Sequence, residues 1–549
     1  MTTRHQSNAG SGPWDVIVVG SGASGGVAAM TLAEAGCRVL VLDAGPELTP
    51  DQAYRPEPLN LVARLANVIG GRHQRQAQHP GYWKANPELY ADERHHPYEH
   101  PEDQPFLWTR GLQVGGRSLT WGGITLRLSD EDFAGVIDDD GERVNWPLGT
   151  QELSEHYASL ERFFRVHGQR DGLEQLPDQE TSSPLPFTPA ETRFAESLKQ
   201  ALGVRLIHSR GFPPRSSSSD WPRSSSCGSS LKSAIDTGRV ELVCDHMVEQ
   251  LIMRSDGETA DGVIAIDQGS GQRHVFKAAR VVLCASTIQT VAILLRSVDA
   301  GLNDPSQRLG TRLMDHISTS QFFAMPRQSG DPPLSARQPA LSGAGSFFLP
   351  FGRRLNGAAF QGGYGIWGGI SRFDPPELLL RRKNTTTGFL IGHGEVMPSK
   401  GNRISLSGTT DRWGMRVPHI ACRWGDNEQA MVQHMRQTIA SCIEAAGAQA
   451  LPLRELFHLP LIEPLLNGAV ALSDDASPPG YYIHEVGGAA MGASESSSVV
   501  DPQNRLWRCP NVLVVDGACW PTSAWQSPTL TMAAISRRAC QLLLSAPAG

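Results

Sequence analysis

Short apolar runs and one amphipathic stretch alternate near the start of the chain. Residues 16–19 (VIVV) and 39–42 (VLVL) are wholly apolar and have the length of buried strands. Between them, Ala28, Leu32 and Ala33 fall on one side of a helix. Strands that are apolar at every position are typical of parallel sheets covered on both faces. The pattern over residues 14–44 therefore predicts a strand–helix–strand unit.

The rest of the chain carries both periodicities. Strand-like runs recur between residues 238 and 285 (VELV, VEQLIM, DGVIAI, HVFKAARVVL), and a strand then a helix close the chain (NVLVVDG, TLTMAAISRRACQLLL). Leu153, Tyr157, Leu160 and Phe164 have helical spacing. Residues 318–472 mix strand-like and helical stretches without repeats, which suits an antiparallel sheet with helices. We expect an α/β protein in which a Rossmann-like domain is joined to a second domain on that sheet.

Two segments lack periodicity. Residues 46–108 are rich in Pro, His, Tyr and acidic residues, which predicts a long excursion that covers another part of the molecule. Residues 209–230 (SRGFPPRSSSSDWPRSSSCGSS) are of low complexity. Their composition fits either a disordered linker or a loop over the surface, and the strand-like run that follows favours the loop.

Composition narrows the class of protein. The 549 residues are 40% hydrophobic and 19% charged with a net charge of -7, which is typical of a globular protein and gives no basic excess for nucleic acid. Residues 1–13 are polar and the first apolar run is too short for a membrane span, so we expect a cytoplasmic location. Nine scattered cysteines without a C-x-x-C pair indicate reduced thiols. The histidines at 95, 96 and 100 lie in a polar stretch, and we expect no metal site.

A glycine motif lies between the first predicted strand and helix. Gly20, Gly22 and Gly25 form G-x-G-x-x-G, and Asp43 ends the second strand. Glycines at these positions permit a tight turn, a close approach to a pyrophosphate, and close packing of helix on strand, while the acid binds ribose hydroxyls. The motif predicts dinucleotide binding, but by itself it does not choose between NAD and FAD.

Nine stretches in one order resemble the glucose-methanol-choline (GMC) family of FAD oxidoreductases. They are VIVVGSGASGG (16–26), QVGGRSLTWGG (113–123), WPLGTQELSEHYASLERFFRVHG (146–168), VVLCASTIQTVAILLRS (281–297), GTRLMDH (310–316), GNRISL (401–406), DRWGMRVP (411–418), HEVGGAAMG (484–492) and NVLVVDGACWPTSAWQSPTLTMAAISRRA (511–539). The HEVGG wording is most similar to the branch with pyranose oxidases and bacterial glycoside 3-dehydrogenases. The resemblance implies an FAD-binding domain of residues 14–50, 106–130, 225–318 and 471–549, a covering insert of 51–105, and a substrate-binding cap of 131–224 and 319–470.

The resemblance also assigns cofactor contacts. Thr120 stands where some relatives carry a flavin-linking histidine, and threonine cannot form that bond, so the FAD should be non-covalent. The residues implied to bind FAD are Gly20, Gly22, Ala23, Ser24, Gly25, Asp43, Ala44, Gly115, Gly116, Ser118, Thr120, Trp121, Val248, Ala285, Asp516, Gly517 and Thr529.

His484 is the implied general base. In the family, this histidine takes the hydroxyl proton while a hydride passes to flavin N5, and a pKa near neutrality suits that task. Ser527 departs from the family, which has Asn or His there to hold the substrate oxygen. Losing one well-aimed donor can cost on the order of a hundredfold in rate. Gln526 could replace that donor or pack elsewhere, and Trp520 and Trp525 could stack on a sugar or belong to the core.

These inferences predict an enzyme that oxidises CH–OH donors, with a carbohydrate or glycoside as the preferred substrate. The electron acceptor is open between dioxygen and a quinone or redox protein. Three alternatives stay open: oxidation of a non-sugar alcohol such as a sterol or natural product, a flavin-binding protein with catalysis impaired by Ser527, and a nicotinamide-dependent dehydrogenase.

Overall fold

A six-stranded sheet forms the core of one half of the molecule. The computed structural model describes residues 14–55, 59–216, 219–332, 339–353, 355, 357–372, 380–382, 384–456 and 476–545. The strands are parallel except β18, which pairs antiparallel with β19. In spatial order they are β18 (Arg505–Leu506), β19 (Cys509–Val514), β10 (Arg280–Leu283), β1 (Val16–Val19), β2 (Val39–Leu42) and β6 (Val240–Val243).

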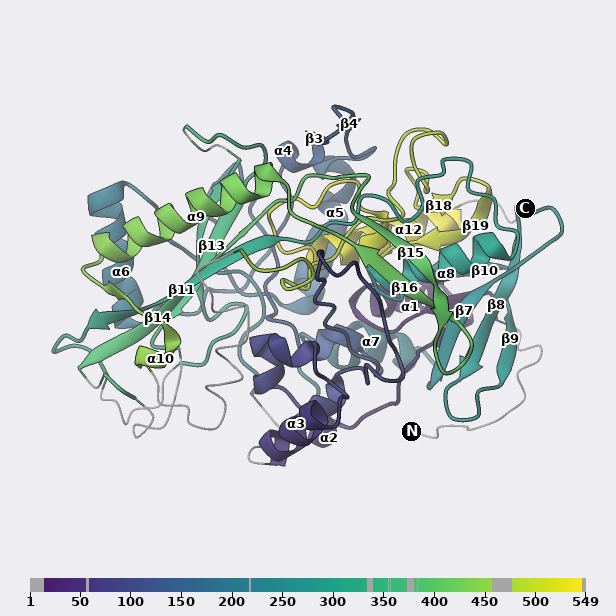
Figure 1. Cartoon of the computed structure of the whole chain (residues 1–549), viewed down its shortest axis with the longest axis horizontal. Coiled ribbons are helices and arrows are strands. Elements are labelled where there is room, and N and C mark those ends of the chain that lie inside the picture. The colour runs from purple at the N-terminus through teal and green to yellow at the C-terminus, as the bar shows by residue number, and fades with distance from the viewer. Residues whose placement is uncertain are drawn as a thin grey trace.

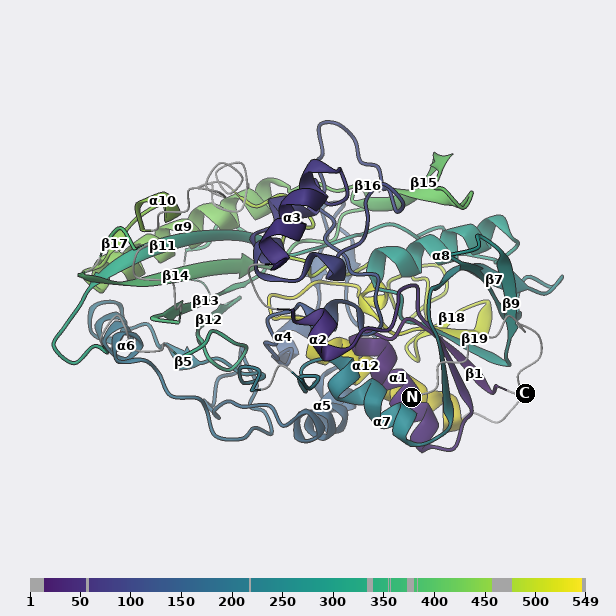
Figure 2. The ribbon, with the colours of Figure 1, turned by 90° about the horizontal axis from the view of Figure 1, so that it is seen from below.

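Helices α1, α7 and α12 lie on one face of this sheet (Figures 1 and 2). The other face is covered by an antiparallel sheet of residues 246–277, which packs against β10, β19 and β2. α1 packs against α12 and α7, and α12 also packs against α5. The predicted strand–helix–strand unit and the last strand and helix are confirmed, because wholly apolar runs are suited to a sheet covered on both sides. The helices are α1 (Ala23–Glu34), α5 (Thr150–Phe164), α7 (Ser230–Asp236), α8 (Thr287–Asp299) and α12 (Thr529–Ser545).

Smaller sheets complete this half. A three-stranded antiparallel sheet lies at the outer end of this half (Figure 1). Two further pairs of strands form hairpins. The strands of the three-stranded sheet are β7 (His246–Met253), β8 (Ala260–Asp267) and β9 (Arg273–Lys277). The hairpins pair β15 (Arg403–Thr410) with β16 (Arg416–Ala421), and β3 (Val136–Ile137) with β4 (Arg143–Val144).

A second six-stranded sheet, which we call the cap sheet, forms the other half of the molecule. One face is covered by α9 (Asp426–Ala445), where Gly392 and Gly394 of β14 leave room for Met435 and Met431. α6 (Pro189–Leu202) packs against α9. The sheet is antiparallel, in the order β17 (Gln449–Ala450), β11 (Ile317–Pro326), β14 (Thr385–Gly394), β13 (Tyr364–Ile370), β12 (Phe347–Gly352) and β5 (Ile207–His208), with α10 (Leu453–Leu456) near its edge. The predicted fold class is therefore confirmed.

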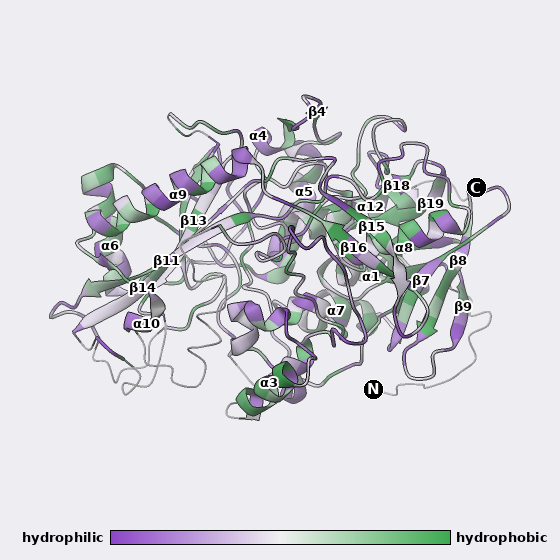
Figure 3. Ribbon diagram, viewed as in Figure 1, coloured by the Kyte–Doolittle hydropathy of each residue, from purple (hydrophilic) through white to green (hydrophobic). Residues whose placement is uncertain are grey.

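The segment after β2 lies over the space between the two halves. It contains α2 (Pro50–Ala53), α3 (Leu59–Ile69) and short 3-10 turns. Ile420 donates its backbone N–H to Glu99, which ties the end of the segment to β16. α3 lies at the lower edge in Figure 3, and its Val62 and Ile69 are 67% and 84% exposed. No helix among the described residues is long and apolar enough to cross a membrane.

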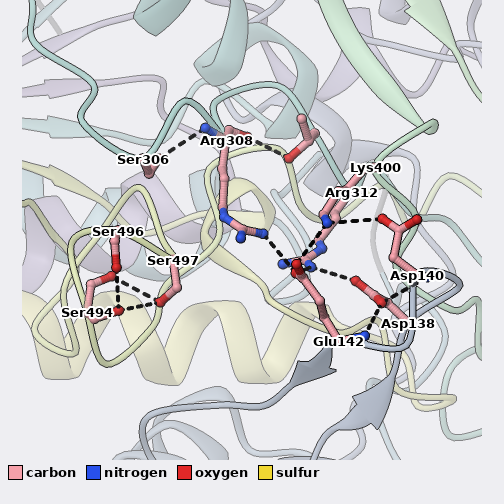
Figure 4. Close-up of polar contacts among 11 residues, drawn as sticks. Asp138, Asp140, Glu142, Ser306, Arg308, Arg312, Lys400, Ser494, Ser496 and Ser497 are labelled. Atoms are coloured by element: carbon pink, nitrogen blue, oxygen red, sulfur yellow. Dashed lines mark hydrogen bonds and ion pairs between the residues drawn. The ribbon is translucent and has the colours of Figure 1, made fainter.

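The short helix α4 (Asp130–Phe133) precedes the β3–β4 hairpin. A charged cluster joins this hairpin to the loop that leads into β11 (Figure 4). Arg312 donates to Asp138 at 2.6 Å and to Glu142 at 2.8 Å. Lys400 pairs with Asp140 at 3.1 Å and with Glu142 at 2.9 Å. Three carboxylates of this hairpin, those of Asp138, Asp140 and Glu142, are thus paired with cations of the chain itself.

The serine-rich segment lies at the surface only in its middle, and both of its ends, residues 209–212 and 225–230, are largely buried. Ser226 is buried; its hydroxyl donates to the carbonyl oxygen of Ser21 at 2.8 Å, and its N–H donates to Ser118 Oγ at 3.0 Å. Small hydroxyl side chains fit against glycine-rich backbone, and their polar groups are satisfied there. The prediction of a surface loop was therefore wrong for residues 225–230, while residues 217–218 lie outside the described part.

Candidate active site

The glycine motif lies where β1 ends and α1 begins. The N-cap of α1, Gly22, offers no side chain, so the first backbone N–H groups of the helix have no side-chain cap. A Cβ on Gly25 would clash with the carbonyl oxygen of Gly20. An uncapped N-terminus of a long helix, with glycines on each side, is suited to bind a pyrophosphate.

The second predicted group of contacts lies on the β2 side of this turn. Asp43 is buried, and its carboxylate accepts the N–H of Ser21 at 3.0 Å and of Gly45 at 3.0 Å. Burial raises the pKa of Asp43. Ala44 follows directly, and Val248 is buried on β7. This arrangement orders the loop that the predicted ribose contact requires.

The turn of residues 115–121 meets the glycine motif. Gly115 has φ 89° and Gly116 has φ 51°, the left-handed region that glycine adopts without strain. A Cβ on Gly22 would lie 3.8 Å from the carbonyl oxygen of Gly115. The backbone N–H of Gly115 also donates a hydrogen bond to Ser21 Oγ at 2.9 Å. Two glycine turns thus approach each other through bare backbone.

The end of β19 supplies a third group. Asp516 accepts a hydrogen bond from Thr290 at 2.6 Å and from the N–H of Ala518 at 3.0 Å. Burial raises the pKa of Asp516 to about 6. Gly517 follows it, and the N–H of Ala285, after β10, donates to Thr290 at 3.1 Å. These groups meet because β1, β2, β10 and β19 are parallel and end at one edge.

An opening with an empty volume of about 350 Å³ lies beside these turns. Its lining includes four residues that the sequence associates with the cofactor, namely Ala23, Ser118, Trp121 and Thr529. Trp121 donates its indole N–H to the carbonyl oxygen of Ser224 at 3.0 Å, and Thr120 is exposed. The uncapped helix, the paired glycine turns and this opening fit a dinucleotide such as FAD.

His484 lies on a strained loop whose backbone is hydrogen-bonded to Asp315. The Asp315 carboxylate accepts the N–H of His484 at 2.8 Å and the N–H of Tyr482 at 3.1 Å. Ile483, between them, has φ 63°, which is unusual for a β-branched residue. Arg117 donates to the carbonyl oxygen of Ile483 at 3.3 Å. Such strain persists only where surrounding contacts impose it, and it is concentrated at functional sites.

The hydrogen bonds of His316 determine which nitrogen of His484 carries a proton. His316 Nε2 lies 2.9 Å from the carbonyl oxygen of Ala524, which can only accept, so Nε2 carries the hydrogen. Burial lowers the pKa of His316 to about 4, so its Nδ1 is a bare acceptor. His484 Nδ1 lies 2.9 Å from it and must donate. Burial also lowers the pKa of His484 well below its ordinary value, in contrast to the near-neutral pKa expected from the sequence, so the ring is neutral and Nε2 has a free lone pair.

A buried ion pair follows His484 in the chain. Arg117 donates to Glu485 at 2.6 Å and to Ser286 Oγ at 2.8 Å, so it joins the loops after β10 and before the HEVGG glycines. Oε1 of Glu485 is buried and makes no hydrogen bond with any described residue. An unsatisfied buried oxygen next to the two glycine turns is consistent with a polar ligand in this place.

The neighbours predicted near the substrate are distributed differently. Gln526 is fully buried and donates to Asp132 at 2.7 Å and to the carbonyl oxygen of Gln175 at 3.3 Å, so its amide packs toward the cap and does not replace the family donor. Trp520 packs edge-on against Trp146, with ring centroids 5.1 Å apart, and belongs to the core. Trp525 is also buried and belongs to a second core cluster with Phe348 of the cap sheet, with ring centroids 6.3 Å apart.

Sequence reasoning missed several residues that touch His484. Asp315 and His316 stand in the family-like stretch GTRLMDH, which offered a signal for them, and Arg117 stands in QVGGRSLTWGG. Tyr482, with its ring centroid 4.9 Å from that of His484, had no signal beyond its closeness in the chain. His393 is brought beside Tyr482 from β14 and could not have been found, because only the cap sheet joins them.

The fold and these loops define the class of the protein: an oxidoreductase with a Rossmann-like dinucleotide site and a cap sheet above it. Models of the GMC oxidoreductase family match residues 14–318 and 398–536. The chain belongs to the GMC oxidoreductase family, whose members are FAD-dependent and act on CH–OH donors. It is accordingly an oxidoreductase that acts on alcohol or sugar-type substrates.

Individual proteins are similar over nearly the whole length. Paromamine 6'-oxidase of Streptomyces fradiae is 25% identical over 96% of this chain and 91% of its own. The 2-methyl-1,2-propanediol dehydrogenase of Mycolicibacterium austroafricanum is 24% identical over 96% and 94%. The structure of pyridoxine 4-oxidase from Mesorbium loti covers 97% of this chain and 100% of its own, with 18% identity and a TM-score of 0.59, which is a likeness of fold.

Proposed function

We propose that this chain oxidises a secondary or primary hydroxyl of a carbohydrate or glycoside, with non-covalent FAD as the hydride acceptor and His484 as the general base. The observation that carries the proposal is the set of hydrogen bonds around His484. It leaves Nε2 with a lone pair and no hydrogen bond to any described residue, as a base that receives a hydroxyl proton requires.

The base is held in place before substrate arrives. Asp315 binds the backbone on both sides of Ile483, His316 fixes the ring through Nδ1, and Ala524 in turn fixes His316. FAD, when bound, supplies the two-electron acceptor for the carbinol hydride. The proton taken by Nε2 can be shared with His316, because the two Nδ1 atoms are already joined by a hydrogen bond.

The residues proposed to hold FAD surround the three loops described above. The glycine motif and the first turn of α1 bind the pyrophosphate, Asp43 and Val248 face the adenosine half, and Ser118, Asp516 and Thr529 face the flavin half. Thr120 offers no nitrogen for a covalent link, so the cofactor is held by these contacts alone. The domain boundaries given above are proposed on the same basis.

A carbohydrate is favoured by the walls around His484. The Tyr482 ring centroid lies 4.9 Å from that of His484, and the Phe348 centroid lies 5.6 Å from that of His393. Flat aromatic rings pack on the apolar faces of pyranoses, while their N–H and O–H groups bind hydroxyls. Similarity to a propanediol dehydrogenase supports a small non-sugar alcohol as the second candidate.

An anaerobic visible spectrum tests the proposal. The purified protein should be yellow, and its flavin absorbance should bleach when one class of monosaccharide, glycoside or diol is added. Air or a quinone dye, added afterwards, should restore the colour and show which acceptor is used.

Two matched histidine variants test the role of the base. His484→Ala should keep its FAD spectrum but lose most of its rate of flavin reduction. His434→Ala is the control, because His434 lies on α9, on the far face of the cap sheet, where it bonds Tyr364 at 2.9 Å. Normal reduction in His484→Ala would refute the assignment, and colourless wild-type protein would refute the cofactor.

A further inference from the structure

His393 is a buried histidine of the cap sheet with no role in the assignment so far. It lies on β14 between Gly392 and Gly394, whose positions face α9, and successive strand residues point to opposite faces. His393 therefore points away from α9, toward the loop that carries His484. Its side chain is nearly inaccessible, with 1% of the residue exposed.

Four aromatic rings form one cluster on this face. The His393 ring centroid lies 4.9 Å from that of Tyr482 and 5.4 Å from that of His316. The His484 ring lies 4.9 Å from each of the same two rings. His393 and His484 thus share both neighbours, although they come from the two halves of the molecule.

A chain of hydrogen bonds favours one tautomer of His393. Trp367 donates its indole N–H to the hydroxyl oxygen of Tyr482 at 2.9 Å, and indole can only donate. The single hydroxyl proton of Tyr482 is then free to point to His393 Nδ1, 2.9 Å away. Burial lowers the pKa of His393 well below its ordinary value, so the ring is neutral. If the Tyr482 proton points to Nδ1, Nδ1 is the acceptor, and we infer that the ring hydrogen is on Nε2.

The two histidines are therefore opposite in hydrogen-bonding character. His393 Nε2 is a donor that is buried and makes no hydrogen bond with any described residue, whereas His484 Nε2 is an acceptor. A buried donor without a partner calls for an explanation, and a catalytic role is one that fits its place beside His484. An alcohol oxygen needs both: an acceptor for its proton and a donor for the negative charge that develops.

Neither of the two residues at the family position, Ser527 and Gln526, offers an amide or imidazole donor to this place. Ser527, at the position where relatives have Asn or His, makes no hydrogen bond to a described residue and has a short side chain. Gln526 is engaged with Asp132 and Gln175. The departure from the family at Ser527 and the unpaired N–H of His393 are separate observations that point to the same missing contact.

We propose that His393 Nε2–H binds the oxygen of the hydroxyl that is oxidised, in place of the family's Asn or His. The assignment rests on the proposed function. The O–H bond breaks and its proton goes to His484 Nε2; the C–H bond breaks and its hydrogen leaves with the electron pair as hydride to FAD; a C=O bond forms. His393 donates a hydrogen bond throughout and transfers no proton.

The first test measures tautomers and does not depend on turnover. Nitrogen NMR of the FAD-bound protein, labelled with ¹⁵N in histidine, should show His393 as the Nε2–H tautomer and His484 as the Nδ1–H tautomer, with signals assigned from His393→Gln and His484→Gln. Tyr482→Phe should release His393 into a mixture of tautomers. A wild-type His393 protonated on Nδ1 would overturn the proposal.

The second test measures anaerobic flavin reduction by the substrate found for the wild type. His393→Phe keeps an aromatic ring without a donor and should be slower on the order of a hundredfold at saturating substrate. His393→Gln should recover part of that rate through its amide N–H, and a purely structural role predicts no such recovery. Trp367→Phe removes a hydrogen bond that is one step further from the substrate, so its loss of rate should be smaller.

The outcomes separate the two assignments. A wild type that is reduced by an alcohol while His393→Phe is reduced equally fast overturns the role of His393 and leaves the proposed function intact. A yellow wild type that no alcohol reduces overturns the proposed function, and the role of His393 fails with it. Retained FAD absorbance in each variant shows that the fold is preserved.

Discussion

Asp315→Asn should make the protein more stable and slower at the same time. Asp315 is fully buried, and burial, followed by the nearby Glu485, raises its pKa to about 7 from an ordinary value of 3.8. Because the folded pKa is the higher one, the stability that the carboxyl contributes is complete below about pH 4 and is lost as the pH rises through about 7. Asparagine stays neutral throughout this range.

The size of the stability difference between the wild type and Asp315→Asn follows from the pKa of Asp315. Between pH 5 and pH 8, ionisation of Asp315 should cost the wild type about 3 kcal/mol that the asparagine variant does not lose. The rate should change in the other direction. The two carboxylate oxygens of Asp315 each accept one backbone N–H beside the strained Ile483. The asparagine amide has only one oxygen, and its NH2 group would face the second N–H, donor against donor.

The loop that carries His484 should then relax. A shift of the base by about 1 Å can cost on the order of a hundredfold in rate. The rate of flavin reduction in the wild type should fall as the pH drops through about 7, because protonated Asp315 resembles the amide. The pH profile of the variant should lack this acidic limb. His484 cannot produce the limb, because its pKa lies well below the ordinary value.

Two measurements decide the matter. Guanidinium unfolding at saturating FAD, at pH 5 and pH 8, gives the stability difference, and stopped-flow anaerobic reduction gives the rate. Glu191→Gln is the control: it breaks a buried pair with Arg372 at 2.7 Å in the cap, so stability should fall while the rate is kept. An Asp315→Asn variant with the wild-type rate at pH 8, or with no gain in stability between pH 5 and 8, contradicts the reasoning.

Three further changes have defined outcomes. Asp138→Asn removes one of the two carboxylates that pair with the buried Arg312 and leaves Glu142 at 2.8 Å, so chemical denaturation should show a loss of about 2 kcal/mol; an unchanged midpoint would exclude a structural role for the pair. Gly25→Ala should yield colourless protein on purification, because the added methyl group collides with the carbonyl oxygen of Gly20; bound FAD at wild-type occupancy would show that the turn can shift. Acid precipitation should release all FAD into the supernatant, because Thr120 cannot link it, and flavin retained in the pellet would reveal a bond elsewhere.

The sequence by itself determined the frame of the protein. Apolar runs such as those at 16–19 and 39–42 could only be strands covered on both faces, and glycines at 20, 22 and 25 between strand and helix indicate a dinucleotide because backbone conformation there is local. The nine family-like stretches predicted the family and the fold correctly. These signals are readable because each depends on residues within a few positions of one another.

Only the tertiary structure decided how the base is surrounded. The sequence placed Gln526 and the serine-rich segment wrongly or ambiguously, because their partners, Asp132 and Ser21, are distant in the chain. The tautomer of His484 depends on Ala524 through His316, and that of His393 depends on Trp367 through Tyr482. Local pattern reports which face of an element is apolar, but the direction of a proton is set by a neighbour that only the packing of two domains supplies.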